Sequence, residues 1–208
     1  MILLACAVAK ELAFWKPRDG VDLLVTGVGP VEGGTAVARA LAQQKYKLVV
    51  SAGIAGAFDG AAKVGDGVVV ISERLELDRE DGTPLVLPDG ERVADVATTS
   101  DELLAGKLEA AGFPGLRGIT VSRVSVTEAT AQRLAALGAQ VETMEGFAVM
   151  RAAERAGIHT IEVRGITNRV GDPTRAAWDF AAGCAGLARG LSALFQILDA
   201  GHQHPELA

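Results

Sequence analysis

Two glutamates and one asparagine stand at places in this sequence where they could do chemistry on a small molecule. Glu11 follows the apolar run 2–8, and a carboxylate at the end of a buried strand can act as a general base toward water. Glu145 lies beside Met144 at the start of an apolar helical stretch, where its carboxylate could accept hydrogen bonds from a sugar diol. Asn168 follows a later apolar run, and its amide can both donate and accept. Each also has a simpler explanation, because acids near helix starts complement the helix dipole and Asn is common in turns.

Two glycine-rich segments could bring backbone groups close to a ligand. The segment 27–30, Gly-Val-Gly-Pro, follows an apolar run but lacks the full spacing of a dinucleotide fingerprint. The segment 51–56 contains Gly53 and Gly56, which would allow the backbone to line a pocket. A tight turn explains the first segment equally well, and close packing of a helix on a sheet explains the second.

The elements that would position these residues alternate along the chain. Apolar runs predict strands over 2–8, 21–28, 48–52, 64–75, 118–126 and 158–167. Helical patterns cover 32–44, 101–111, 127–137, 144–156 and 176–198. This alternation predicts an α/β fold with a mostly parallel or mixed sheet, and ligands in such sheets lie at the carboxyl ends of the strands. The glycines of 53–56 are expected to end the third strand.

Composition agrees with this fold class and narrows the partners. The 208 residues fit one domain over 1–200, followed by a frayed tail over 201–208. Hydrophobic residues make up 49% and aromatic residues only 4%, so the core must be built from Ala, Val, Leu and Ile, as in parallel α/β layers. The net charge of −6, with scattered Lys and Arg, argues against nucleic acid as a partner. Small molecules or further copies of the chain are expected instead.

Metals, cofactors and membranes are not expected. Cys6 and Cys184 lie far apart in apolar surroundings, as small buried side chains do, and the three histidines form no plausible ligand set. No run of about 18 uninterrupted apolar residues is present. The first ten residues lack a basic region and are read as a strand, not a signal peptide. We therefore expect a cytoplasmic protein.

Taken in order, these segments resemble the purine nucleoside phosphorylase and nucleosidase superfamily from Met1 to about Leu198. The shared features are the Glu after strand one, the Gly-x-Gly after strand two, the Ala-Gly-x-x-Gly turn, a Val-Gly-Asp strand start, the Met-Glu helix and the Arg-Gly-Ile-Thr-Asn strand end. Each motif is weak alone, whereas the ordered set is specific. The resemblance implies a three-layer fold with a central mixed sheet flanked by helices.

Within the superfamily, the chain looks most like the futalosine hydrolases of the alternative menaquinone route. The indications are Asn168, the following Val170-Gly171, and Trp178. The related methylthioadenosine/adenosylhomocysteine nucleosidases carry Asp at the position of Asn168. An amide donates hydrogen bonds to N7 and a 6-oxo group but does not readily deliver a proton, so Asn168 favours hypoxanthine over adenine. The implied reaction is hydrolysis of futalosine to hypoxanthine and dehypoxanthine futalosine.

The resemblance also implies roles for single residues. Glu11 would orient and deprotonate the attacking water, and Glu145 would bind the ribose hydroxyls, with Met144 beneath the sugar. Asn168 would stabilise the leaving purine while the ribose becomes oxocarbenium-like. Arg164 is expected to brace Glu145 or the strand end and not to touch substrate.

The purine pocket is less closely defined by the resemblance. Gly53, Val126 and Thr127 are expected to line it. Aromatic stacking would come from Phe147, from Trp178 or Phe180, or from a neighbouring subunit, because the stacking Phe of the nucleosidases aligns with Val126. A Ser of the nucleosidases is replaced here by Ile54, which removes a hydroxyl from the region of the water.

Three alternatives stay open at this point. The first is a methylthioadenosine/adenosylhomocysteine-type nucleosidase. The second is a purine nucleoside phosphorylase, which needs a phosphate pocket, for which Arg74 is the one candidate. The third is a nucleoside-binding sensor, which would not need Glu11. Subunits of the superfamily commonly pair beside the active site, so a homo-oligomer is expected.

Overall fold

The structure is a computed structural model that describes residues 1–203, apart from 78, 80–82, 84, 92, 94, 95, 100, 173 and 175–177, and without the side chains of 201–203. The strands of the described part are β1 (Ile2–Cys6), β2 (Val21–Val25), β3 (Leu48–Ala57), β4 (Gly67–Leu75), β5 (Val96–Thr98), β6 (Gly115–Thr120), β7 (Val141–Thr143) and β8 (His159–Arg169). The helices are α1 (Pro30–Gln43), α2 (Glu102–Ala110), α3 (Glu128–Ala136), α4 (Gly146–Arg155) and α5 (Phe180–Gln203), with a 3-10 turn, η1, at Ala9–Leu12.

All of these strands belong to one mixed sheet. It runs in the order β2-β1-β3-β7-β6-β4-β5, and β8 pairs with both β3 and β4. The strands β3, β7, β6, β4 and β8 therefore close into a ring, from which β1 and β2 extend on one side and β5 on the other. Pairing is parallel for β1 with β2 and β3, for β3 with β8, and for β6 with β4 and β7. The predicted α/β fold with a central, mostly parallel mixed sheet between helices is confirmed.

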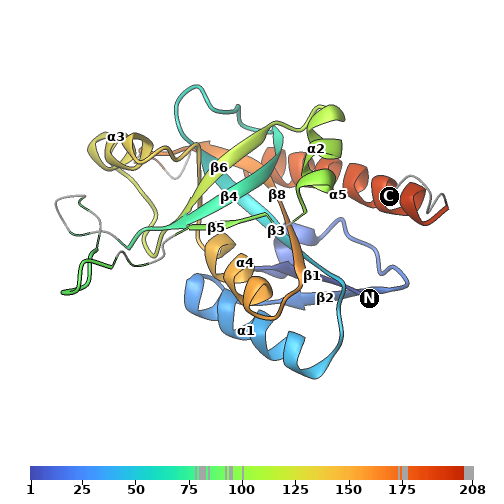
Figure 1. Ribbon diagram of the computed structural model, residues 1–208. Helices are drawn as coiled ribbons and strands as arrows, with labels where there is room; N and C mark the ends of the chain where they lie inside the picture. The colour runs from blue at the N-terminus through green and yellow to red at the C-terminus, as the bar shows by residue number, and fades with distance from the viewer. Residues whose placement is uncertain are drawn as a thin grey trace.

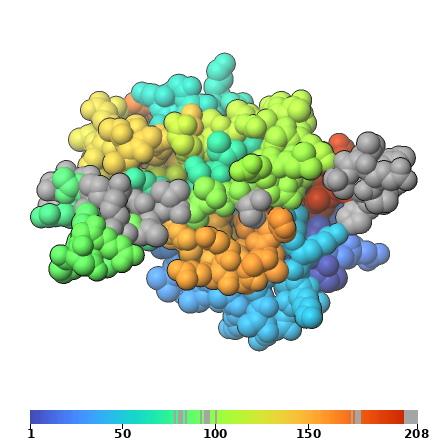
Figure 2. All heavy atoms as spheres, in the orientation of Figure 1, coloured from blue at the N-terminus to red at the C-terminus, as the bar shows by residue number. Residues whose placement is uncertain are grey.

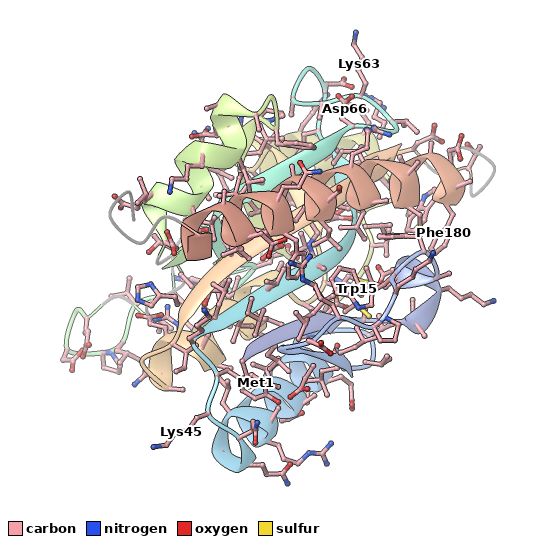
Figure 3. All side chains as sticks on the ribbon, turned by 90° about the vertical axis from the view of Figure 1, so that its right-hand side faces the viewer. Met1, Trp15, Lys45, Lys63, Asp66 and Phe180 are labelled. Atoms are coloured by element: carbon pink, nitrogen blue, oxygen red, sulfur yellow. The ribbon has the colours of Figure 1, made fainter. Side chains whose placement is uncertain are left out.

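Helices cover the sheet on opposite faces. Helices α1 and α4 lie side by side (Figure 1), and the space-filling view shows them in contact over one face (Figure 2). They pack onto β1 and β3 through a core of small aliphatic residues: Leu3, Ala5, Val37, Val49, Val149 and Ala153. Figure 3 shows α5 lying across the other face, with Phe180 near one end. The two helical layers hold β1, β3 and β8 in fixed positions between them.

Helix α5 approaches the sheet unusually closely. A side chain added at Gly165 of β8 would overlap the carbonyl oxygen of Gly183 in α5, and one at Gly186 would approach the carbonyl oxygen of Asp66 to 2.6 Å. The segment Phe180–Ala200 has the length and mean hydropathy, 1.3, of a membrane span. Its buried leucines, however, pack against the strands of the sheet, as those of a core helix do.

Several predicted boundaries change in the structure. The third strand does not end at Gly53, because β3 continues to Ala57 and pairs with β7 and β8 beyond that point. Strand β7 has three residues, too few for its period to be visible in the sequence. Helix α5 begins at Phe180, and its backbone stays helical to Gln203, where a frayed tail had been expected. The rest of that predicted tail, 204–208, lies outside the described residues.

Candidate active site

A cavity of about 200 Å³ lies where the ends of β1, β3, β7 and β8 meet. Four of the residues predicted to carry chemistry line it: Glu11, Met144, Glu145 and Asn168. They come from four separate places in the fold, namely η1, the turn after β7, the start of α4 and the end of β8. The carboxyl-end rule for α/β sheets therefore locates the same cavity that the sequence motifs pointed to.

Glu11 is held by backbone groups on two sides. It is buried on η1, and its Oε1 accepts a hydrogen bond from the N–H of Ile54 at 3.1 Å. Its Oε2 accepts from the N–H of Val8, also at 3.1 Å. A carboxylate oxygen has lone pairs for more than one donor, so each oxygen can still accept from a water in the cavity. This geometry suits a general base whose orientation is fixed by strands β1 and β3.

Glu145 is the N-cap residue of α4 and is held by the start of α1. Its Oε1 accepts a hydrogen bond of 2.7 Å from the N–H of Gly29. Gly29 has φ of +98°, a conformation that favours glycine, and it also caps α1, so the positive end of that helix dipole faces the carboxylate. Burial raises the pKa of Glu145, and the Arg164 charge and the Gly29 N–H offset part of this rise.

Arg164 lies behind the cavity. Its Nε donates to Glu162 Oε1 at 2.7 Å, and its second terminal nitrogen donates to Ser51 Oγ at 3.2 Å. The guanidinium is fully buried, yet its pKa is raised by the surrounding carboxylates Glu162, Glu145 and Glu11. It therefore braces the acids around it electrostatically and is not among the residues that line the cavity.

Only glycine fits at position 53, because Arg164 and Glu11 occupy the space that a side chain would need. A Cβ at Gly53 would collide with a terminal nitrogen of Arg164 and come within 3.1 Å of Glu11 Oε1. Gly53 was predicted to line the purine pocket, but it is not among the cavity residues. Its glycine lets the guanidinium pass close behind β3, and the neighbouring Ile54 reaches the cavity instead.

Asn168 reaches the cavity because the pairing of β3 with β8 is irregular. Ala55 pairs with Ile166, whereas the next residue, Gly56, pairs with Asn168, so Thr167 is an extra residue on β8. Asn168 thus lies beside a glycine and not beside Ala57. Its Oδ1 accepts from Thr167 Oγ1 at 2.8 Å, and its Nδ2 donates to the carbonyl of Arg169 at 3.1 Å. The amide has a second N–H that can donate to a ligand.

The other cavity walls are largely apolar. Val28, Ile54, Val124, Met144 and Trp178 all contribute to the lining. A flat, mostly apolar ligand with a few polar edges fits a cavity of this kind. Trp178 is one of the aromatic residues predicted to stack on a purine, and it is the one that lines the cavity.

Three other predicted binding residues do not line the cavity. Val126 is 50% exposed, and Val124 from the same loop takes the place expected for it. The Thr127 side chain caps α3 by accepting from the N–H of Thr130. Phe147 is buried beneath α4 against Ala97 and Met150, so it turns away from the ligand space. The residue of this loop that lines the cavity, Val124, thus comes two positions before Val126.

Glu142 is a cavity residue that received no role from the sequence. It is 7% exposed on β7, and its Oε1 accepts from the N–H of Ser125 at 3.1 Å. Burial raises its pKa, and the hydrogen bonds from Ser125 offset part of that rise. The available signal was an acid two residues before Met144, in a stretch predicted to precede a helix, which is too common to give Glu142 a role of its own.

Comparisons with known proteins agree with the fold and show the family. The family model of the phosphorylase superfamily matches residues 16–200. A futalosine hydrolase of Streptomyces coelicolor is 37% identical over 202 residues, which cover 89% of this chain and 83% of that protein. A futalosine hydrolase of Thermus thermophilus is 33% identical over 190 residues, covering 86% of this chain and 84% of that protein.

Solved structures show the same fold at much lower identity. A futalosine hydrolase of Helicobacter pylori has a TM-score of 0.80 at 16% identity. The match covers 94% of this chain and 97% of that protein. A 5′-methylthioadenosine/S-adenosylhomocysteine nucleosidase of Neisseria meningitidis, in complex with methylthio-immucillin-A, has a TM-score of 0.77 at 14% identity, with 93% and 97% covered. At these identities the likeness establishes the shared fold alone.

Proposed function

The chain belongs to the futalosine hydrolase family of the phosphorylase superfamily, and we propose that it hydrolyses the N-glycosidic bond of futalosine to release hypoxanthine. The observation that carries the proposal is that Glu11 and Asn168 face one cavity from opposite sides of β3. Glu11 can act as a general base toward water, and Asn168 can hold the departing purine. The cavity thus has the two groups that N-glycosidic hydrolysis needs, one to activate water and one to stabilise the leaving purine.

The ribose is bound by Glu145 and Met144 in this proposal. Glu145 Oε1 is already fixed by the Gly29 N–H, so the carboxylate can accept the ribose hydroxyls without reorganising. Met144 lines the cavity next to it and provides an apolar surface beneath the sugar. A carboxylate close to the ribose also stabilises the positive charge that develops as the glycosidic bond stretches.

The leaving purine is held by Asn168. As the bond breaks, negative charge builds on the base, and the free N–H of the Asn168 amide donates a hydrogen bond to it. Thr167 Oγ1 donates to Asn168 Oδ1, which fixes the amide so that its NH2 group is the side available to the base. An amide stabilises this charge without transferring a proton, which suits a 6-oxopurine whose N7 and O6 both accept.

The attacking water is placed by Glu11. With its two oxygens fixed by Val8 and Ile54, the carboxylate can orient a water toward the ribose and accept its proton. The negative charge of Glu11 is balanced by Arg164 behind it. Ile54 contributes its backbone N–H here, so the missing serine hydroxyl of the related nucleosidases is not needed to hold Glu11.

Hydrolysis is favoured over phosphorolysis by the charges around the cavity. Among the described lining residues there are three carboxylates, at Glu11, Glu142 and Glu145, and no Arg or Lys. Arg74, the one residue predicted as a phosphate ligand, is not part of the lining. A phosphate dianion would be repelled by these acids, whereas a neutral water would not.

Product analysis tests the proposal directly. We expect purified protein to release hypoxanthine from futalosine at the same rate with and without inorganic phosphate, as measured by chromatography of the products. Aminofutalosine, methylthioadenosine and inosine serve as parallel substrates. Strict dependence on phosphate with release of a sugar 1-phosphate would establish a phosphorylase, and a preference for methylthioadenosine would establish the rival nucleosidase.

The variant Asn168→Asp tests the choice of base. An aspartate can protonate N7 and accept from a 6-amino group, so the variant should shift the ratio of kcat/KM from futalosine toward aminofutalosine by about 10- to 100-fold. Asp59→Asn, on the exposed partner of Arg169, is the matched control and should leave the ratio unchanged. If wild type and variant share one preference, Asn168 does not determine the base.

The proposal also covers the assembly and location of the protein. Val8, Val28 and Trp178 are exposed at the cavity, and a second copy of the chain could cover this apolar rim. We propose a homo-oligomer on this basis, and light scattering after gel filtration measures its mass. Cys6 and Cys184 are both free, as expected in the reducing cytoplasm, which is the location that we propose.

A further inference from the structure

The Glu142 carboxylate has one oxygen that the fold does not use. Its Oε1 accepts from the Ser125 N–H, but its Oε2 is buried and has no hydrogen-bond partner among the described residues. An unsatisfied buried carboxylate oxygen is costly, and such groups are rare in folded proteins unless a ligand completes them. Because Glu142 lines the cavity, the missing donor is expected to come from the bound molecule.

The position of Glu142 places it at the base end of the cavity. Gly56 of β3 pairs with Glu142 of β7 on one side and with Asn168 of β8 on the other. The acid and the amide therefore flank one glycine, and a side chain at Gly56 would come within 3.1 Å of Asn168 Nδ2. Gly56, Glu142 and Asn168 all line the cavity, so a flat ring in the cavity can contact both side chains.

Electrostatics separate Glu142 from the ribose end. Glu11 and Glu145 both feel the charge of Arg164, whereas the groups that act on Glu142 are Ser125 and the nearby Glu76. The cavity thus has a sugar end with a balancing cation and a second end with an acid that has none. A neutral ring that brings its own N–H donor suits this second end.

Three polar atoms on two adjacent edges of a 6-oxopurine match this arrangement. N7 and O6 accept hydrogen bonds on one edge, and N1, on the other side of O6, carries a hydrogen that it can donate. In a 6-aminopurine, N1 is an acceptor, and its lone pair would face the lone pairs of a carboxylate. A site that must hydrogen-bond one group discriminates strongly against an analogue that lacks it.

We propose that Glu142 is a specificity-determining residue that accepts the N1–H of the hypoxanthine ring, while Asn168 donates to the N7 and O6 side. This inference rests on the proposed function and adds the recognition of the N1 edge, which adjoins the N7 and O6 edge assigned to Asn168. Hypoxanthine is then held from two strands across Gly56. The 5′ group of the nucleoside plays no part in this choice.

The test compares free bases, so that it does not depend on catalysis. The dissociation constants of hypoxanthine and adenine are measured by calorimetry for wild type and for Glu142→Gln. The glutamine keeps a carbonyl oxygen for the Ser125 N–H but offers N–H in place of the free Oε2. Loss of a hydrogen bond to a charged group should weaken hypoxanthine binding by roughly 10- to 100-fold, with adenine unchanged or tighter.

Glu76→Gln is the matched control, because it removes the same charge near Glu142 from a residue outside the cavity that pairs with Arg133. It should leave the hypoxanthine to adenine ratio unchanged. If Glu142→Gln weakens both bases equally, Glu142 only anchors the Ser125 loop and the inference is wrong. An unchanged hypoxanthine affinity overturns it as well.

A second measurement uses the wild-type protein alone and holds even where the variant does not fold. 1-Methylhypoxanthine keeps N7 and O6 but lacks the N1–H, and it should bind at least about 10-fold more weakly than hypoxanthine. Equal binding of the two overturns the inference. Wild-type protein that neither cleaves futalosine nor binds hypoxanthine refutes the proposed function itself, whereas cleavage with an unchanged base ratio in Glu142→Gln refutes this inference only.

Discussion

Buried carboxyl groups occur in two sets, one lining the cavity and one in the core, and the two sets are held in different ways. The cavity acids, Glu11, Glu142 and Glu145, accept hydrogen bonds from backbone N–H groups at the ends of strands and at a helix start. The core acids, Glu73 and Glu162, accept from side chains instead. Glu73 is bound by the hydroxyls of two threonines and Glu162 by the Arg164 guanidinium.

The difference shows how one residue type serves two purposes. Backbone N–H groups bind the cavity acids, and each of these carboxylates still has lone pairs that can accept from a ligand. The core acids are enclosed by side chains and by the start of α4, where a side chain at Gly146 would come within 2.7 Å of both oxygens of Glu162. The cavity acids thus line the space proposed to bind the substrate, whereas the core acids interact with Arg164.

The largest effect is expected from Glu11→Gln. The amide keeps the shape of the side chain but is a far weaker base, so kcat on futalosine should fall by about 10³-fold, with hypoxanthine binding retained. Steady-state kinetics and calorimetry measure the two quantities. Glu154→Gln, on the exposed end of α4, is the control. Unchanged turnover would remove Glu11 from the mechanism and with it the distinction between the two sets of acids.

The next largest effect is expected from Arg164→Met, which removes the cation shared by Glu11, Glu145 and the two core acids. Glu162 would be left buried without a partner, and the free energy of unfolding should fall by about 3–5 kcal/mol in urea titration. Arg164→Lys keeps the charge and should lose less. If the methionine variant is as stable as wild type, the core acids are held without the guanidinium, and the comparison fails.

The smallest effect is expected from Glu73→Gln. Burial, followed by the charge of Glu162, raises the pKa of Glu73 well above its ordinary value of 4.5. Between pH 4.5 and this raised pKa, the folded state holds a proton that the unfolded chain has lost. The free energy of unfolding of the wild type therefore falls as pH rises through this range. The glutamine does not titrate, and kcat/KM should stay within about 2-fold of wild type, because Glu73 does not line the cavity.

The measurement for Glu73→Gln is the difference in unfolding free energy between variant and wild type across pH. It should move in favour of the variant by at most about 1.4 kcal/mol per pH unit above pH 4.5. Glu154→Gln should show no such trend. A difference that is flat with pH would mean that Glu73 titrates as an exposed acid does, contrary to its enclosure by Thr120 and Thr143.

The order of strands and helices, and four cavity residues, could be predicted from the sequence because long apolar segments mark the elements, and the four residues stand next to the ends of these segments. Glu11 and Asn168 were found in this way. Glu142 lies in the same short segment as Glu145 but received no individual role, because β7 is three residues long and its pairing with Gly56, far earlier in the chain, is not visible in the sequence. The full extent of β3 could not be predicted for a related reason. The sequence alone does not distinguish a glycine that ends a strand from one that, like Gly53, leaves room for the Arg164 side chain.

The contact between Gly165 and Gly183 has a consequence for motion. Where a strand and a helix touch through their backbones, the strand can open only if the helix leaves, so the amide protons of central β8 should exchange with solvent only on global unfolding. Glu11 lies on a single 3-10 turn, whose amides can exchange through small local openings. In the proposed mechanism, the departing purine would thus be held from a strand that opens rarely, and the water would be activated from a turn that opens more readily.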